Sequence, residues 1–409
     1  MTDFLNDPVI SKFLRYVAVP TMSQEDVEEI PSTKKQFALA EMLVRELKAL
    51  GLSDARSDSH GYVYGTLPGT VDPSEDHPVI GMIAHMDTSC EAPDEPIRPS
   101  IRLYEGKDLL INEEKNLYLS ESQFPEMGLY KGKHLIVTDG TTLLGGDDKA
   151  GVAEIMAALE RIVNEKRPHR TIKVAFTPDE EVGRGAELFD IPGFGADYAY
   201  TIDGGRLGEL EYENFNAASG NIFIYGINVH PGSAKGKMVN ANLIASEIIG
   251  KFPSNETPAT TEKYEGYYHL LSMQGSVEYV KLHYIIRDHD RQKFEARKAF
   301  MQQVVDGINE KYGQGTCEAV ITDSYFNMKE EMMKHPEVIK KAEQAFREMN
   351  VPVITQPIRG GTDGATLTLR GLPCPNICTG DNNAHSRFEY VCAEDMITIS
   401  GIIYRIWTD

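Results

Sequence analysis

The chain has 409 residues, which is too long for a single small core, so we expect roughly two or three domains. Its net charge of −21 disfavours nucleic acid as a partner, because phosphate contacts need clustered Lys and Arg. Hydrophobic residues make up 41% of the chain, as in ordinary globular proteins, and no apolar run approaches the roughly 20 residues of a membrane-spanning helix.

The first residues and the cysteines indicate a cytoplasmic protein. The start, MTDFLNDPVI, lacks the basic and apolar regions of a signal peptide. Five scattered cysteines do not make a disulfide framework. Cys374 and Cys378 form a C-x3-C pair that cannot complete a zinc site alone, and we interpret them as reduced core thiols.

Four apolar runs end in residues that could bind a ligand. They are, in chain order, HPVIGMIAHMD, TIKVAFTPDEE, ADYAYTIDGG and LPCPNICTGDNNAHS. The second run alternates Ile172, Val174 and Phe176 on one face, which is the period of a β-strand. Nearly continuous apolar strands suit a sheet that is covered by helices on both faces. Ligands of such sheets bind beyond the carboxyl ends of the strands, where these polar residues fall.

The helical pattern completes an α/β fold. The segment DDKAGVAEIMAALERIVNEK carries an apolar stripe at helical spacing, and HPEVIKKAEQAFREM reads as a second helix. We predict a mixed, mostly parallel sheet covered by helices on both faces, with an inserted α+β lid domain.

The lid domain is predicted from a change of pattern at about residue 213. From there to about residue 323 the order is strand, strand, helix, strand, strand, helix, strand. The predicted domains are therefore a catalytic domain formed by 1–212 and 324–409, and an inserted lid formed by 213–323.

A set of histidines and acids at the strand ends points to metal chemistry. The signatures of zincins, serine hydrolases and phosphate-binding loops are absent from the sequence. The set comprises His85, Asp87, Asp147, Asp148, Glu180, Glu181, Asp203 and His385. Imidazole and carboxylate groups together suit zinc, and a carboxylate can bridge two ions about 3.5–4 Å apart. Each residue taken alone more often has a structural role, so the hypothesis depends on their common place at one sheet edge.

Seven motifs in the same order resemble a known family. They are HMDTS, GGDDKAG, TPDEEVGRGAE, TIDGG, NVHPGSAKGK, PIRGGTDGA and NNAHS. Together they resemble the di-zinc metallopeptidase family that includes carboxypeptidase G2, carnosinases and succinyl-diaminopimelate desuccinylase. The resemblance covers essentially the whole chain, and Asp203 of TIDGG matches the tripeptide aminopeptidase branch, where many relatives have Glu.

The resemblance implies two Zn²⁺ ions per subunit and a role for each matching residue. The implied zinc ligands are His85 and Asp203 for one ion, Glu181 and His385 for the other, and Asp147 as the bridge between them. Glu180 would be the general base that takes a proton from the attacking water. Asp87 would orient His85, since residues two apart on a strand face the same way.

The inserted segment would contribute to substrate binding. His230 of NVHPG matches the residue that polarises the scissile carbonyl in the family. Asn240, Arg287 and Arg359 lie at looser matches and would anchor the substrate.

The resulting hypothesis is a cytoplasmic aminopeptidase that removes the N-terminal residue from short peptides, above all tripeptides. One alternative is a di-zinc amidase or deacylase acting on N-acyl amino acids, which the same metal core could serve. The second is a non-catalytic peptide-binding protein that keeps the fold. The oligomeric state stays open, with a homodimer as one candidate.

Two further expectations concern the acidic runs DDK and DEE. The resemblance predicts a non-proline cis peptide between Asp147 and Asp148. In the acidic run DEE, we assign zinc binding to Glu181 and base catalysis to Glu180, and we expect Asp179 to be solvated.

Overall fold

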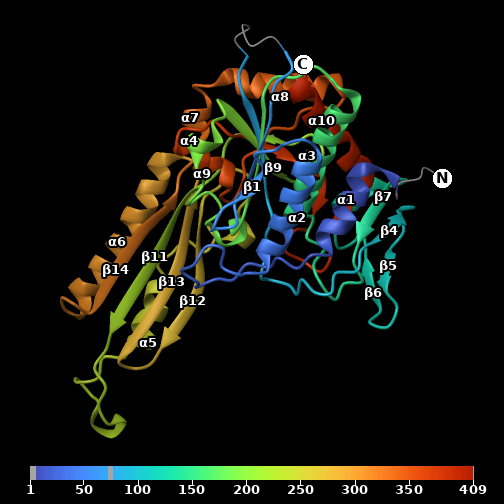
Figure 1. Cartoon of the computed structure of the whole chain (residues 1–409). Coiled ribbons are helices and arrows are strands. Elements are labelled where there is room, and N and C mark those ends of the chain that lie inside the picture. Colours follow the sequence, from blue (N-terminus) through green and yellow to red (C-terminus); the bar gives the residue numbers. More distant parts are fainter. Residues whose placement is uncertain (1–5, 72–76, 409) are drawn as a thin grey trace. The chain divides into compact units, whose positions relative to one another are not determined.

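The four apolar runs of the sequence form the four central strands of one sheet. The computed structural model describes residues 6–71 and 77–408. The sheet has seven strands in the order β1-β2-β8-β3-β9-β15-β10 (Figure 1). Their bounds are β1 (Arg56–Ser57), β2 (Val63–Leu67), β8 (Ile172–Thr177), β3 (Ile80–His85), β9 (Tyr198–Gly204), β15 (Asn376–Cys378) and β10 (Leu210–Glu211). The central strands β8, β3, β9 and β15 are parallel and the edge strands pair antiparallel, so the sheet is mixed, as predicted.

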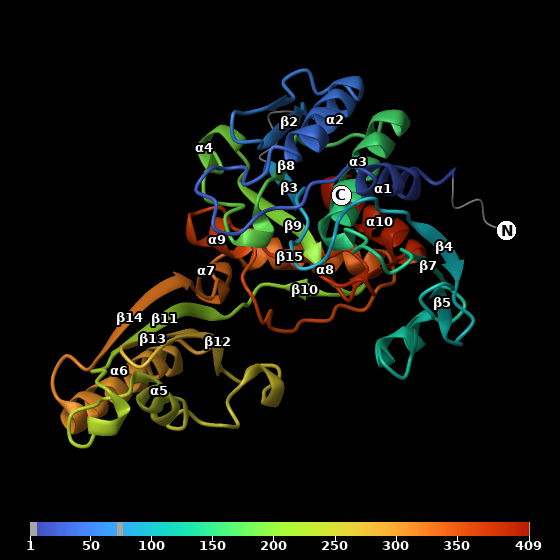
Figure 2. The same ribbon diagram turned by 90° about the horizontal axis from the view of Figure 1, so that it is seen from below.

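Helices cover both faces of this sheet. Figure 2 shows α4 and α9 on one side of the strands and α1, α3 and α10 on the other. On the first face Ile83 and Ala175 pack with Phe189 and Phe194. On the other face α3 contacts β3 and β9 and packs against α1 and α10. The helices of this part of the chain are α1 (Pro8–Val17), α2 (Gln36–Ala49), α3 (Gly146–Glu165), α4 (Ile191–Phe194), α7 (Lys329–Met332), α8 (Pro336–Glu348), α9 (Asp363–Leu369) and α10 (Ala393–Thr408).

Two small sheets extend the same part of the chain. A four-stranded sheet has the order β16-β17-β7-β4, and β5 pairs with β6. Their bounds are β4 (Ser100–Leu103), β5 (Leu109–Asn112), β6 (Leu117–Leu119), β7 (His134–Val137), β16 (Asp381–Asn382) and β17 (Tyr390–Cys392). The loop between β16 and β17 carries His385, so this sheet brings a distant segment to the candidate site.

The chain divides into two compact units. The first contains the chain up to Tyr212, Glu330–Thr355 and everything from Thr362 on, and the second contains Glu213–Lys329 and Gln356–Gly361. The second unit has an antiparallel sheet in the order β12-β13-β11-β14. Its elements are β11 (Asn216–Tyr225), α5 (Ala241–Ile249), β12 (Tyr267–Gly275), β13 (Tyr279–Asp288), α6 (Arg291–Tyr312) and β14 (Cys317–Tyr325).

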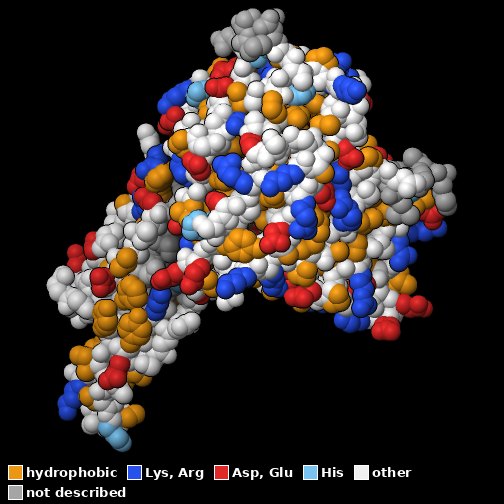
Figure 3. Space-filling model, viewed as in Figure 1, with side chains coloured by type: hydrophobic (Ala, Val, Ile, Leu, Met, Phe, Trp, Pro, Cys, Tyr) orange, Lys and Arg blue, Asp and Glu red, His pale blue; other side chains and the backbone are white. Residues whose placement is uncertain are grey.

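The second unit has its own core on one face of its sheet. Alternate residues of β11 and β13, such as Ile222 and Leu282, pack with Ile244 of α5 and Met301 of α6. Elsewhere on the strands hydrophobic side chains remain exposed, Leu271 among them, and Figure 3 shows such side chains gathered over this unit. The sequence predicted two strands before α5. The structure has one, β11. After it, residues 227 and 239 form only an isolated antiparallel bridge.

Three asparagines tie together the segments by which the chain enters and leaves the second unit. We call Asn214, Asn216 and Asn327 the asparagine cluster. Asn216 donates from Nδ2 to the carbonyls of Asp288 and His289, both at 3.0 Å, and its Oδ1 accepts the N–H of Asn327 at 3.1 Å. Asn327 Oδ1 accepts the N–H of Asn214 at 3.2 Å. Asn214 and Asn216 are buried, so their amides are satisfied by protein groups alone.

Residues 356–361 return to this unit after the chain has left it. The N–H of Ile358 donates to the Glu213 carbonyl at 2.8 Å, and the Ile358 carbonyl accepts from His289 Nε2 at 3.0 Å. The predicted lid segment 213–323 does not include these residues, because their pairing with residue 213 leaves no local sequence pattern.

Within residues 6–71 and 77–408, no helix has the length and apolarity to cross a membrane. All five cysteines are free, and Cys374 and Cys378 are buried. Their interpretation as core thiols is confirmed.

Candidate metal centre

The first of two ligand clusters lies where β3 and β9 end. These neighbouring strands are parallel, so their carboxyl ends bring His85 and Asp203 to the same edge. Asp147 comes to the same place from the start of α3. His85 Nε2 lies 2.8 Å from Asp147 Oδ1 and 3.6 Å from Asp203 Oδ1.

The second cluster shares Asp147. Glu181 follows β8, and His385 lies in the loop between β16 and β17. His385 Nε2 lies 2.7 Å from Glu181 Oε2 and 3.4 Å from Asp147 Oδ2. One carboxylate oxygen of Asp147 therefore faces each histidine, which is the arrangement that a bridging ligand requires.

The residues of both clusters fit a pair of divalent metal ions. Within each cluster the candidate ligand atoms lie within 4.8 Å of one another. Nitrogen from imidazole and oxygen from carboxylate are the donors that zinc sites mix. Glu181 Oε1 is buried and has no hydrogen-bond partner in the described part of the chain. Burial and the nearby Asp147 charge raise the pKa of Glu181 to about 8, while the hydrogen bond with His385 opposes this shift.

The turn before α3 aims Asp147. Gly145 has a φ of 77°, a left-handed conformation that glycine adopts without strain. A Cβ on Gly146 would overlap Asp381 and Val391. The peptide between Asp147 and Asp148 is cis, as the family resemblance predicts.

Asp148 belongs to neither cluster and accepts hydrogen bonds from the backbone. Its Oδ2 accepts the N–H of His85 at 3.0 Å, and its Oδ1 accepts the N–H of Gly151 at 3.2 Å. It therefore joins the end of β3 to the first turn of α3. The two neighbouring acids thus have different surroundings, although the sequence shows them as a simple pair.

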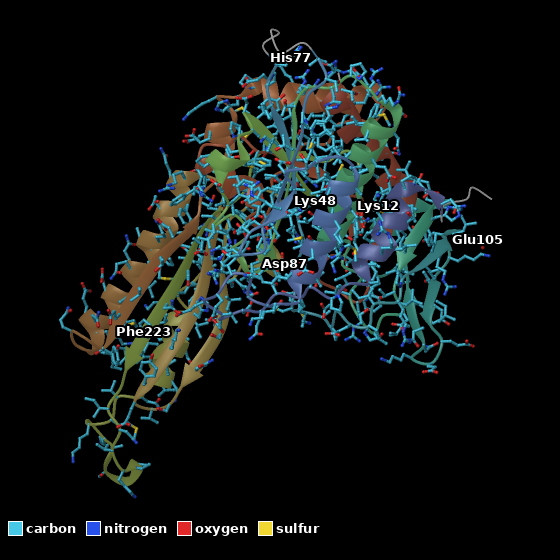
Figure 4. The ribbon with its side chains drawn as sticks, in the orientation of Figure 1. Lys12, Lys48, His77, Asp87, Glu105 and Phe223 are labelled. Atoms are coloured by element: carbon cyan, nitrogen blue, oxygen red, sulfur yellow. The ribbon has the colours of Figure 1, made fainter. Side chains whose placement is uncertain are left out.

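Asp87 contacts a histidine and also holds the acidic turn. Its Oδ1 lies 3.3 Å from His85 Nδ1. The same carboxylate accepts the N–H of Glu180 at 3.0 Å and the N–H of Glu181 at 3.2 Å. Figure 4 labels Asp87 among the side chains of the first unit. Sequence reasoning assigned only the contact with His85, because the two backbone partners come from another strand end.

The expectation that Asp179 is solvated is wrong. Asp179 is fully buried, and its carboxylate accepts the N–H and hydroxyl of Ser32, both at 2.6 Å, and Gln36 Nε2 at 2.7 Å. These partners precede or begin α2 and are far away in sequence. Asp179 therefore fixes the start of the acidic turn, with a φ of 55°.

The surroundings of Glu180 favour its protonated form. Burial, followed by the charge of Asp203, raises the pKa of Glu180 well above its ordinary value. A raised pKa suits a group that takes and returns a proton.

The four other predicted site residues lie in the second unit and do not form one cluster there. His230 is exposed, and its Nδ1 accepts the N–H of Gly232 at 3.1 Å. Asn240 caps α5 by accepting the N–H of Asn242 at 3.0 Å. Both follow the end of β11 at Tyr225.

Arg287 and Arg359 lie near the opposite end of the same sheet. Arg287 pairs in register with Ala217 and Tyr267, and the Arg359 guanidinium stacks over the Tyr267 ring at 5.4 Å. Arg359 Nη1 also donates to the carbonyl of Lys263 at 2.8 Å. The sequence motifs did not reveal that these arginines already have protein partners.

Sequence reasoning missed one buried acid beside the clusters. Glu389 is 2% exposed and accepts the N–H of Asp147 at 3.1 Å. The only signal was an acid four residues after His385, and such a spacing is common.

Comparisons with known proteins show the family to which the chain belongs. The model of Peptidase family M20/M25/M40 matches residues 139–409. A protein of Alkaliphilus oremlandii called Peptidase T is 51% identical over 400 residues, which cover 97% of this chain and 98% of that protein. The chain belongs to the peptidase T family.

Two solved structures of other bacterial proteins share the fold of this peptidase T family member. The aminopeptidase PepT of Bacillus cereus matches with a TM-score of 0.76 at 24% identity, over 98% of this chain and 97% of that one. A tripeptidase of Staphylococcus aureus matches with a TM-score of 0.78 at 22% identity, over the same shares. The predicted fold class and family are confirmed, and the chain is a peptidase.

Proposed function

We propose that this peptidase is a cytoplasmic, zinc-dependent aminopeptidase that removes the N-terminal residue from short peptides, above all tripeptides. The observation that carries the proposal is Asp147, whose two oxygens face two different histidine–carboxylate clusters. The names of the Bacillus cereus aminopeptidase and the Staphylococcus aureus tripeptidase support the substrate class.

Five side chains would hold two Zn²⁺ ions. His85 and Asp203 would bind one ion, Glu181 and His385 the other, and Asp147 both. Bound zinc would polarise the substrate carbonyl and lower the pKa of a coordinated water to about 7. Asp87 would keep Nε2 of His85 directed at the ion by contacting Nδ1 of the same ring.

Glu180 would move the proton during the reaction. It would accept a proton from the attacking water and return it to the amine that leaves. The two hydrogen bonds from the Glu180 and Glu181 N–H groups to Asp87 fix the turn on which both carboxylates stand. Adjacent acids can then do different work, one as base and one as ligand.

We further propose that the second unit acts as a lid that supplies substrate contacts. Since His230 Nδ1 accepts the Gly232 N–H, its proton lies on Nε2, which can donate to the oxyanion that develops on the carbonyl. Asn240, Arg287 and Arg359 would anchor the peptide. Arg359 already donates through Nη1 to the backbone carbonyls of Lys263 and Glu265, which hold its guanidinium in place.

Metal analysis and a matched peptide panel test the proposal. We expect two zinc ions per chain and faster hydrolysis of trialanine than of dialanine or tetra-alanine, with no hydrolysis of N-acetyl-trialanine. Faster turnover of the acetylated peptide would favour the amidase alternative. A zinc-free protein that binds trialanine without turnover would favour the non-catalytic one.

A further inference from the structure

The turn that carries Asp147 is held by a buried carboxylate from another part of the chain. Glu389 Oε2 accepts the N–H of Leu144 at 2.6 Å and of Gly145 at 2.9 Å, and Oε1 accepts the N–H of Asp147 at 3.1 Å. Three donors on one carboxylate leave the turn little freedom.

The same Glu389 is joined rigidly to the loop of His385. Its own N–H donates to the Ser386 carbonyl at 3.1 Å, and Ser386 Oγ accepts the N–H of Phe388 at 3.0 Å. Asn383 Nδ2 closes the loop by donating to the Phe388 carbonyl at 3.1 Å. Glu389 therefore connects a candidate ligand on its own loop to the candidate bridge on another.

Asp87 gives an internal precedent for this arrangement. Asp87 holds the turn of Glu180 and Glu181 through two backbone N–H groups, just as Glu389 holds the turn of Asp147 through three. Both acidic turns of the site are thus fixed by a buried carboxylate that does not belong to either ligand cluster.

We propose that Glu389 is a positioning residue that sets the place of Asp147 relative to His385, so that binding of both metal ions depends on it. This inference rests on the proposed function, because it requires Asp147 to bridge the two ions. Displacing a bridging ligand weakens the binding of both ions, whereas losing a terminal ligand weakens the binding of one ion.

Cobalt binding provides a readout that does not depend on turnover. Metal-free wild-type protein, Glu389→Gln and Glu389→Asp would be titrated with Co²⁺, with affinities from chelator competition and ligand geometry from the visible spectrum. The matched control is Glu394→Gln. Glu394, five residues later, also accepts a backbone N–H, that of His134 at 2.9 Å, but contacts no candidate ligand.

We expect Glu389→Gln to weaken the binding of both Co²⁺ ions by about 10- to 100-fold and to change the visible spectrum. Substituting residues that hydrogen-bond to metal ligands has effects of this size in other metal sites. Glu389→Asp, which keeps the charge, should recover part of the affinity. Glu394→Gln should bind like the wild type, and His385→Ala should lose one ion only.

Three results would overturn the inference. They are wild-type affinity in Glu389→Gln, weakening of one ion only, and loss of folding in both Glu389 variants while Glu394→Gln folds. If the wild type itself binds no Co²⁺, the proposed function fails. If the wild type binds two ions and cleaves trialanine while Glu389→Gln is unchanged, only the role of Glu389 fails.

Discussion

Two gatherings of buried polar side chains in this protein differ in kind. At the edge of the seven-stranded sheet they are acids and histidines, whereas the asparagine cluster of the second unit is neutral. Asn216 has protein partners for both atoms of its amide, while Glu181 Oε1 has none among the described residues. Burying a charge costs far more than burying an amide whose hydrogen bonds are made. A bound cation would offset this cost at the acids, whereas the asparagines meet their hydrogen bonds with one another and with nearby backbone groups.

The largest expected effect separates the two adjacent acids of the metal centre. Glu180→Ala should keep two zinc ions but lose about 10²- to 10⁴-fold in turnover, because the base is gone and the ligands remain. Glu181→Ala should lose one ion, with partial recovery of activity in excess zinc. Zinc content and turnover, measured on the same samples, check this. Equal zinc loss in both variants, or an active Glu180→Ala, would show that the pair is assigned wrongly.

Metal removal should affect the acid cluster and leave the asparagine cluster alone. Free zinc at roughly 1,000 times its Kd stabilises a folded protein by about 4 kcal/mol. We expect chelation to lower the free energy of unfolding by an amount of this order. Asn216→Ala should show the same zinc-dependent increment as the wild type. An unfolding midpoint that ignores zinc would contradict the comparison.

Substitution in the asparagine cluster should cost stability without touching metal content. Asn216→Ala leaves two carbonyls and one N–H without their partner, and one buried unsatisfied group costs about 1–3 kcal/mol. Chemical denaturation should therefore show a loss of about 2 kcal/mol or more, with two zinc ions retained. The exposed Asn255→Ala is the control and should change little. A loss of zinc in Asn216→Ala would break the distinction between the clusters.

The last effect is confined to a pH dependence and concerns an acid that belongs to neither cluster. Glu154 of α3 is fully buried, and neither carboxylate oxygen has a partner within the described residues. Burial raises the pKa of Glu154 well above its ordinary value. The folded chain then holds a proton that the unfolded chain releases above about pH 4.3, so stability falls as pH rises, by about 1.4 kcal/mol per pH unit.

Glu154→Gln should remove this dependence. The variant should gain on the wild type as the pH rises above about 5, as measured by denaturation at several pH values. Parallel pH profiles for the two proteins would mean that Glu154 is not held in its neutral form.

The elements of the fold could be predicted because their signals are local. The apolar runs ending at His85 and Asp203 became β3 and β9, and the helix predicted in DDKAGVAEIMAALERIVNEK became α3. The candidate ligands were found for the same reason, since each follows a strand or begins a helix.

What the sequence did not reveal depends on contacts between distant segments. Asp179 looked solvated because Ser32 and Gln36, which bury it, lie more than 140 positions away. Glu389 went unnoticed because its partners are backbone N–H groups, which every residue type except proline carries. In both cases the missing information was which segment packs against the acid.

The return of residues 356–361 determines how this protein could be dissected. A contiguous fragment of residues 213–329 would contain all strands of the second sheet and its asparagine cluster. It would still lack Ile358, which accepts the hydrogen bond from His289, and Arg359, whose guanidinium stacks on Phe215 and Tyr267. His289 and the two aromatic rings would then lose partners that the full chain supplies. The second unit is therefore encoded in two pieces, and a free-standing version would need the short peptide 356–361 joined to it.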